Sequence, residues 1–313
     1  RRWCRRHRSR CRRHAPTVCR RRAGRARRAH RRTTRSHPTS RRTVPVVDDH
    51  RPHDRAAPLH QGTRGGLAMH SLVVLGDSVG FGVGDEDNLH PNKGVGAFLH
   101  RSLPGFTKYA NHSRPGARMR EVFEVQLPKA LEHDPDVVVL IAGGNDVLRQ
   151  NFDPTDIYWS MYGTVTTLRE RGVEVLTMKL HDPNRKIRLP KRLARLLHQR
   201  VETLNHIIDD VSQLLGAQCL DVRQIDLAYD QRIWHIDRMH PNRTGYHLLA
   251  KHFARLLHGQ GHDVRDVTAP LVRTRSRKEN VRWMWRMGLP WFLKRCKDLF
   301  PGVGYLLVLE TSK

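Results

Sequence analysis

The chain has 313 residues and a net charge of +27 at neutral pH, with 38% hydrophobic and 28% charged residues. This length is typical of one large domain or two small ones, and the absence of any run near the ~18 apolar residues of a membrane span argues against an integral membrane protein. Most of the charge lies in residues 1–68, where 22 arginines, no lysine and three aspartates give +19 of the total.

Residues 1–68 are not expected to fold by themselves. They contain few aliphatic or aromatic side chains, so burial of apolar surface cannot offset the entropy lost on ordering the chain. The first methionine is Met69, directly before the first apolar run. We therefore expect the biological protein to begin at or near Met69, with 1–68 as upstream sequence. The alternative is a genuine arginine-rich arm that binds nucleic acid through its phosphates.

The cysteines indicate a reducing compartment. There are five, at positions 4, 11, 19, 219 and 296, and an odd number argues against a disulfide framework. The twin arginines near the start are not followed by the apolar stretch of about 7–15 residues that a signal peptide needs. We expect a cytoplasmic protein. The Cys-x-x-His pairs at 4–7 and 11–14 resemble a zinc pattern only faintly, and no metal is expected.

From Met69 onward, short apolar runs alternate with amphipathic segments. The apolar runs predict five strands, and because several are apolar throughout, these strands should be buried on both faces of a parallel sheet. The three-and-four spacing of apolar residues between them predicts helices on both faces, which gives an α/β fold with a five-stranded parallel sheet. The predicted strands are Leu72–Leu75, Thr107–Asn111, Asp136–Ala142, Val173–Leu180 and Gln218–Val222, and the predicted helices are Met119–Glu132, Thr155–Arg171, Lys191–Leu215 and Thr244–Leu257.

The alternation stops after about residue 262. Residues 270–280 are a basic linker, residues 281–300 mix tryptophan and phenylalanine with arginine and lysine, and 302–309 are apolar. We expect a domain at 69–262 and a basic, aromatic helical appendage at 263–313. One interpretation packs this appendage on the domain. The other lays it peripherally on the inner membrane surface, with Trp283, Trp285 and Trp291 at the level of the lipid headgroups.

Three polar motifs follow three of the predicted strands. A Gly-Asp-Ser turn at 76–78 follows the first strand, Gly-Gly-Asn-Asp at 143–146 follows the third, and Asp-Arg-Met-His at 237–240 comes after the fifth. Ligand sites in parallel sheets form beyond the carboxyl ends of the strands, which lie at one edge. We therefore expect the three motifs to converge there.

The residue types in these motifs are those of an acyl-transfer site. Ser78 can act as a nucleophile if an imidazole takes its proton, and His240 is the candidate base. Asp237 can orient that imidazole and stabilise its cationic form. The negative oxygen of the intermediate needs fixed donors, and the backbone N–H of Ser78 and the side-chain amide of Asn145 are suitable.

The three motifs resemble those of the SGNH hydrolases, also called the GDSL esterase/lipase family, over about residues 71–258. The resemblance implies a flavodoxin-like three-layer α/β/α fold, and it implies that Ser78, Asp237 and His240 are the catalytic residues. It also implies an oxyanion hole formed by Ser78, Asn145 and a glycine after the second strand, which we assign to Gly116. The surrounding sequence departs from the family pattern at Arg114 and Pro115, and Val79 stands where leucine is usual.

The sequence therefore predicts a serine hydrolase that cleaves carboxylic esters through an acyl-enzyme, with a small-molecule ester as its partner and no cofactor. One alternative is a thioesterase or carbohydrate O-deacetylase that uses the same site, with specificity set by loops such as 84–94 and 181–190. A different class is a non-catalytic basic protein that binds nucleic acid through 1–68. A third is a membrane-surface protein attached through 281–309.

Overall fold

The computed structural model describes residues 70–85, 92–185 and 191–268, together with 278, 281–282 and 285–286. These all belong to one of two units of the chain, Thr63–Lys313. The arginine-rich segment 1–68 lies outside the described residues, as does most of the appendage predicted at 263–313. Among the described residues, no helix is long and apolar enough to cross a bilayer.

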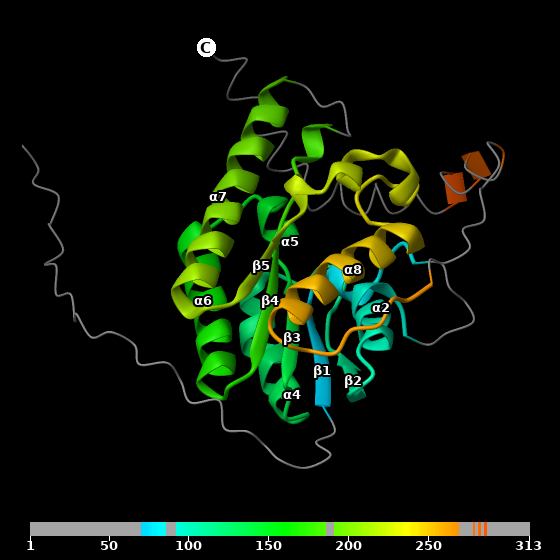
Figure 1. Ribbon diagram of the computed structural model, residues 1–313. Helices are drawn as coiled ribbons and strands as arrows, with labels where there is room; N and C mark the ends of the chain where they lie inside the picture. The colour runs from blue at the N-terminus through cyan, green and yellow to red at the C-terminus, as the bar shows by residue number, and fades with distance from the viewer. Residues whose placement is uncertain are drawn as a thin grey trace, which may run out of the picture. The chain divides into compact units, whose positions relative to one another are not determined.

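Five parallel strands form one sheet, in the order β2-β1-β3-β4-β5 (Figure 1). The strand order reverses between β1 and β3, the point at which open α/β sheets place their sites. The predicted five-stranded parallel sheet is confirmed, with strand ends shifted by one or two residues. The strands are β1 (His70–Gly76), β2 (Phe106–Asn111), β3 (Val137–Ile141), β4 (Glu174–Lys179) and β5 (Gln218–Asp221).

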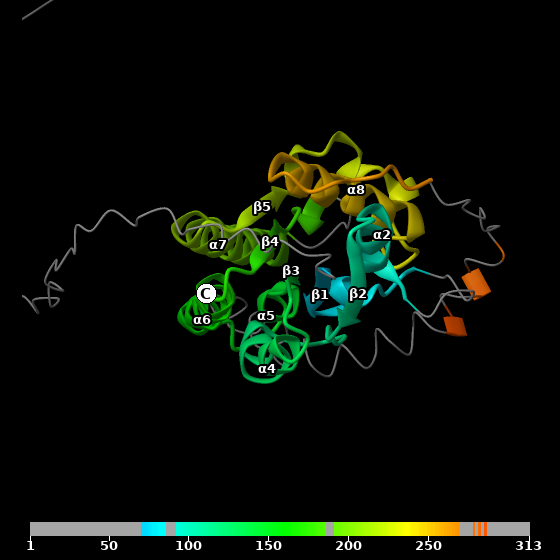
Figure 2. The same cartoon turned by 60° about the horizontal axis from the view of Figure 1, so that its bottom comes forward.

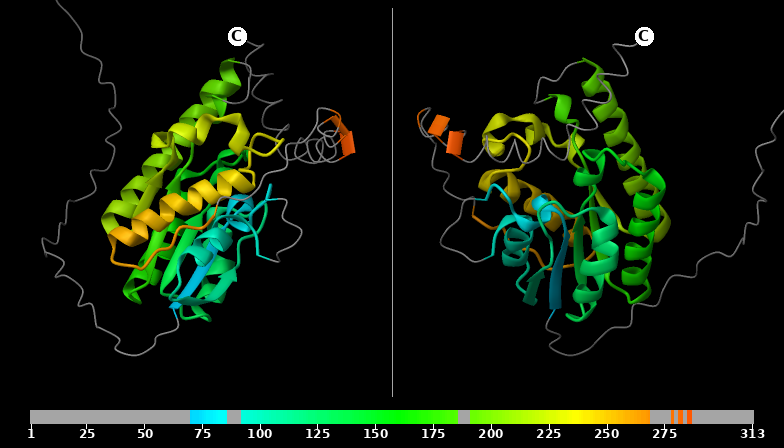
Figure 3. Two further views of the ribbon diagram at one scale, coloured as in Figure 1. Left: turned by 45° about the vertical axis from the view of Figure 1, so that its right-hand side comes forward. Right: turned by 180° about the vertical axis from the view of Figure 1, so that it is seen from behind.

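Helices cover both faces of the sheet, as Figure 2 shows. Side chains alternate along β1, so that Leu72 and Val74 belong to one buried cluster and Val73 and Leu75 to the other. The left view of Figure 3 shows α8 in front of the strands. The predicted three-layer α/β/α fold is confirmed. The first cluster includes α2 (Gly94–Ser102) and α8 (Arg243–Gly259), and the second includes α3 (Met119–Glu121), α4 (Leu127–Leu131), α6 (Pro154–Glu170) and α7 (Lys191–Leu215).

Short helical segments complete the connections between these elements. They are α1 (Ser78–Phe81), the π-helical turn η1 (Val122–Gln126), α5 (Gly144–Val147), and the 3-10 turns η2 (Pro183–Arg185), η3 (Val222–Gln224), η4 (Asp226–Tyr229) and η5 (Gln231–Ile233). Those that follow β1 and β3 carry two of the three sequence motifs.

The helix α2 was not among the predicted segments, although its apolar side chains are buried. Its sequence contains two glycines, which lower helix propensity. Gly96 is nevertheless explained by packing, because a Cβ atom there would lie 2.3 Å from the Cγ2 atom of Val74. The close approach of α2 to β1 therefore requires glycine at 96, the same residue type that weakens the helical signal in the sequence.

The predicted regular helix Met119–Glu132 is wrong in its middle turn. The π-helical turn η1 interrupts it, and this adds a residue to one turn of the helix. The apolar spacing of this segment predicts that Val122, Val125 and Leu127 share a buried face; Val122 and Leu127 are buried, but Val125 is 46% exposed. Val125 lies inside this wider turn, where the period of 3.6 residues no longer holds.

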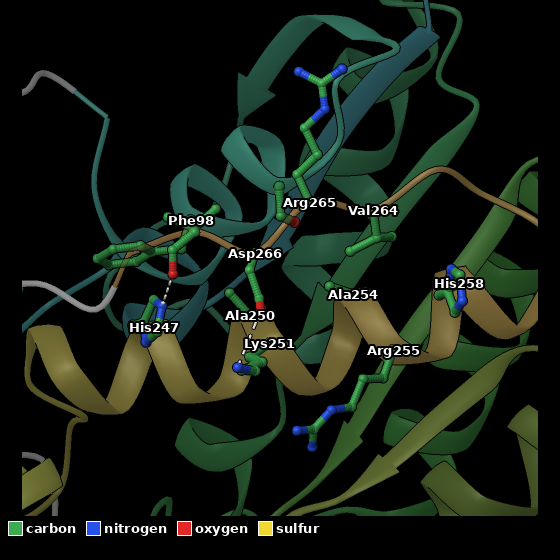
Figure 4. A pocket seen from close by; sticks show the side chains of 12 residues that line it. Phe98, His247, Ala250, Lys251, Ala254, Arg255, His258, Val264, Arg265 and Asp266 are labelled. Carbon is green, nitrogen blue, oxygen red and sulfur yellow. Dashed lines mark hydrogen bonds and ion pairs between the residues drawn. The ribbon is translucent and has the colours of Figure 1, made fainter.

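Residues 264–267 follow α8 and pack back against the domain. The N–H of Arg265 donates to the carbonyl of Ser102 at 2.8 Å, and His247 Nε2 lies 2.8 Å from the carbonyl of Val267. A cavity of about 460 Å³ lies between α2, α8 and this segment, and Figure 4 shows Lys251 and Asp266 facing each other there. Contact with the domain thus continues beyond residue 262.

Candidate active site

The turn that carries Ser78 depends on a glycine at the end of β1. Gly76 has a φ of +145°, and a Cβ atom at this position would lie 1.9 Å from the carbonyl oxygen of Ile141 on β3. Only glycine fits there without moving backbone. Asp77 then caps α1, because its Oδ1 accepts the N–H of Val79 at 2.9 Å. Ser78 is consequently the first residue of α1, directly beyond the sheet edge.

A glutamine side chain fixes the same backbone from below the turn. Gln126, in η1, accepts the N–H of Gly76 through Oε1 at 2.7 Å and donates from Nε2 to the carbonyl of Gly76 at 2.9 Å. Gln126 is only 3% exposed. These two hydrogen bonds satisfy the buried N–H of Gly76 and give its carbonyl a second donor besides the N–H of Arg114. Sequence reasoning missed it.

Ser78, His240 and Asp237 form one hydrogen-bonded row. The Oγ atom of Ser78 lies 2.8 Å from Nε2 of His240, and Nδ1 of His240 lies 2.8 Å from Oδ2 of Asp237. With the ring proton on Nδ1, the imidazole donates to the carboxylate and accepts the serine hydroxyl. The structure therefore brings together the three residues that the sequence singled out, across 162 positions of the chain.

The loop that carries His240 is a tight hairpin. Trp234 and Pro241 form an antiparallel bridge, and the N–H of His235 donates to the carbonyl of His240 at 2.8 Å. Asp237 stabilises the tip of this hairpin, since its Oδ1 accepts the backbone N–H of residues 239 and 240 at 2.8 and 3.0 Å. Asn242 then caps α8 through a bond from the N–H of Gly245 at 3.0 Å.

The pKa values of the carboxyl groups in the site are shifted in opposite directions. Burial disfavours ionisation of Asp237, but hydrogen bonds from His235 and His240 outweigh it and hold the pKa of this carboxyl well below its usual range. Burial instead raises the pKa of Asp77 to about 6, and it raises the pKa of Asp146 to about 6 as well. Asp237 is therefore the carboxylate best suited to remain ionised beside an imidazole.

The turn after β3 holds the loop after β2. The side-chain amide of Asn145 donates to the carbonyl of Ala117 at 3.0 Å, and Oδ2 of Asp146 accepts the N–H of Met119 at 3.0 Å. Gly116 belongs to this loop and has a φ of +90°. The structure thus places Asn145 and Gly116 on two segments that are joined to each other.

The loop after β2 is also joined to the helix of Ser78. The amide of Asn111 donates to the carbonyl of Gly80 at 3.0 Å, and a Cβ atom at Gly80 would lie 2.5 Å from the hydroxyl of Ser113. The segments with Ser78, Asn145 and Gly116 are therefore mutually anchored. Within the ranges described, no three or more His, Cys, Asp or Glu side chains are arranged to hold a metal ion.

A parallel sheet with a strand-order reversal, and a serine, an imidazole and a carboxylate in a row beyond its edge, define an α/β enzyme of the hydrolase class. Residues 74–248 match the model of the GDSL-like lipase/acylhydrolase family. The chain belongs to this family and is a hydrolase that acts on ester bonds. The family predicted from the three motifs is confirmed. A comparison with curated proteins gave no match.

The chain is also similar to several solved structures. A lipase/acylhydrolase from Enterococcus faecalis is 18% identical, with a TM-score of 0.50, and the match covers 64% of this chain and 100% of that one. The esterase EstA from Pseudoalteromonas is 14% identical, with a TM-score of 0.48, over 61% and 98% of the two chains. The acetylxylan esterase Axe2 from Geobacillus stearothermophilus is 18% identical, with a TM-score of 0.47, over 60% and 94%.

Proposed function

We propose that the chain hydrolyses carboxylic esters through an acyl-enzyme intermediate on Ser78. The observation that carries this proposal is the 2.8 Å approach of Ser78 Oγ to His240 Nε2, with Asp237 at 2.8 Å from the other ring nitrogen. A serine hydroxyl is a weak nucleophile by itself, and an oriented imidazole in this position activates it.

In the first half of the reaction, Ser78 Oγ attacks the ester carbonyl while His240 takes the hydroxyl proton. The resulting tetrahedral intermediate collapses when His240 returns that proton to the departing alcohol. In the second half, His240 takes a proton from water, whose oxygen attacks the acyl group, and the Ser78 hydroxyl is restored as the acid leaves. Asp237 stays ionised and stabilises the imidazolium in both halves.

The negative oxygen of the intermediate is stabilised by the backbone N–H of Ser78, the amide of Asn145 and the backbone N–H of Gly116. An asparagine amide has two N–H donors. One N–H of Asn145 is used by the carbonyl of Ala117, at 3.0 Å, which fixes the direction of the other. Such preorganised donors stabilise a developing charge without rearranging during the reaction.

Replacement of the nucleophile tests this proposal. Ser78→Ala should abolish turnover of a short-chain chromogenic ester, and a fluorophosphonate probe should label Ser78 in the parent and fail to label the variant. Ser102→Ala is the matched control, because the Ser102 hydroxyl only donates to the carbonyl of Leu99, at 2.7 Å within α2. Asn145→Ala should lower kcat by about a hundred- to thousandfold. Full activity of Ser78→Ala would refute the proposal.

Rates on different substrates test which acyl chain and which leaving group the site accepts. The loops expected to bound the substrate, 84–94 and 181–190, lie partly outside the described residues. Relative rates on acetyl, octanoyl and thioester substrates separate an esterase from a thioesterase or an O-deacetylase. Nucleic-acid binding through 1–68 and membrane contact through 281–309 stay predictions, since these segments lie almost wholly outside the described residues.

A further inference from the structure

A second histidine approaches the carboxylate that supports His240. Nδ1 of His235 lies 3.1 Å from Oδ2 of Asp237, the same oxygen atom that binds His240 at 2.8 Å. The angles of this contact fall outside those of a regular hydrogen bond, unlike those of His240, yet the atoms are close and the His235 side chain is only 10% exposed. Two imidazoles therefore share one carboxylate oxygen, although esterolysis by a serine needs only one of them.

The backbone of His235 is held independently of its side chain. Its N–H donates to the carbonyl of His240 at 2.8 Å, and its carbonyl accepts the N–H of Arg238 at 2.9 Å. The second of these bonds closes a β-turn over residues 235–238, which places Asp237 inside the turn that begins at His235. The hairpin thus brings the ring of His235 to the carboxylate of Asp237, and a change of side chain at 235 should leave the hairpin in place.

The glycine-rich segment after Ser78 packs against His235. Gly84 has a φ of +96°, and a Cβ atom there would lie 3.0 Å from the Cβ of His235 and 2.5 Å from the carbonyl oxygen of Pro241. The backbone at 84 therefore packs directly on the hairpin, which limits the positions that the His235 ring can occupy.

We propose that His235 is a positioning residue for Asp237: its Nδ1 N–H lies against Oδ2, limits the movement of that oxygen beside His240, and takes up part of the carboxylate charge. This inference rests on the proposed function, in which His240 is the base. A carboxylate that shares its charge with a second donor interacts less strongly with His240, so removal of that donor should strengthen the interaction between Asp237 and a His240 cation.

Other titratable groups lie near Asp237 and His240, and every variant compared keeps them. Asp77, from the turn after β1, interacts with His240, and Asp146 in α5 interacts with Asp77. Asp85 is paired with Arg243 at 3.0 Å. Tyr246 on α8 lies near these carboxylates, and burial keeps its pKa well above the ordinary value, so it stays neutral. None of them is altered by a substitution at 235.

The test compares His235→Phe, which keeps a ring without a nitrogen, with His235→Asn, whose amide can donate from nearly the position of Nδ1. In the phenylalanine variant kcat should fall about tenfold with little change in KM, and the acid limb of the pH–rate profile should move about half a pH unit or more upward. The asparagine variant should restore both. His247→Phe, on α8 and bonded to the carbonyl of Val267, is the matched control.

Titration of the His240 ring, followed by NMR in each variant, gives a readout that does not need turnover. His240 should gain its proton at higher pH in His235→Phe than in the parent. Identical titration curves, or a uniform loss of rate with no shift of the acid limb, would overturn the positioning role. Failure of the proposed function itself would instead appear as activity retained by Ser78→Ala.

Discussion

The hydrogen bonds of Gln126 should affect both the stability of the domain and the position of Ser78. Gln126→Met keeps a side chain of similar length in the buried site but removes both polar contacts with Gly76. The carbonyl of Gly76 would keep one partner, because it also accepts the N–H of Arg114 at 3.1 Å. The N–H of Gly76 would lose the partner that it has in the parent.

The expected cost follows from these two losses. A buried N–H without a partner costs about 1–3 kcal/mol, and the second hydrogen bond contributes about 1 kcal/mol. We therefore expect the free energy of unfolding to fall by about 2–4 kcal/mol. With an m-value of about 2 kcal/mol/M, the midpoint of urea unfolding should fall by roughly 1–2 M. Because Gly76 is two residues from Ser78, kcat should fall as well.

Urea unfolding followed by far-UV circular dichroism measures this effect. Gln213→Met is the matched control, since Gln213 is exposed on α7, and it should change the free energy of unfolding by less than about 0.5 kcal/mol. If Gln126→Met is as stable as Gln213→Met, then the paired bonds to Gly76 do not support the turn, and the reasoning is wrong.

Two further substitutions test the local physics of the site. The pKa of Asp146 is raised from 3.8 to about 6, so the stabilisation present at low pH, where the carboxyl is protonated, is lost as pH rises through 6. Between about pH 4 and pH 7, the stability of Asp146→Asn relative to the parent should therefore rise by up to about 3 kcal/mol. A difference in the free energy of urea unfolding that does not change with pH would contradict this. Arg238 has a φ of +57°, a conformation that glycine adopts freely and a β-branched residue does not. In thermal unfolding, Arg238→Gly should be neutral or raise stability by about 0.5–1 kcal/mol, whereas Arg238→Val should lower it by about 1–2 kcal/mol. Equal effects of the two substitutions would count against backbone strain at this position.

The sheet and the catalytic row could be predicted because their signals are local. A strand such as Val137–Ile141 is buried at every position, and an apolar, β-branched run in the sequence reflects that directly. Candidates for a nucleophile and a base are equally visible, because few residue types can fill these roles. Ser78 and His240 follow different strands, and the rule that strand ends share an edge was enough to bring them together.

The prediction failed where packing overrides local preference. The glycines of α2 lower its helical signal, yet Gly96 is there because the helix touches Val74. The π-helical turn η1 could not be read from apolar spacing, since that spacing assumes a constant period. The turn is also where Gln126 reaches Gly76, 50 residues away in the sequence. The π-helical turn, which the apolar periodicity does not predict, thus carries the side chain that holds the end of β1.

His235 differs from Gln126, because its signal was present in the sequence. The pattern His-x-Asp places a second donor two residues from the predicted orienting carboxylate, and the β-turn over 235–238 brings the two side chains together. That pattern did not single out His235 among 21 histidines until the hairpin was known. Residues that contact substrate are limited by their chemistry, whereas residues that hold a backbone or a carboxylate need only donate a hydrogen bond, which many residue types can do. Supporting residues of this kind are therefore identified by geometry, and the asparagine variant at 235 tests that view because it should function with a different side chain in the same place.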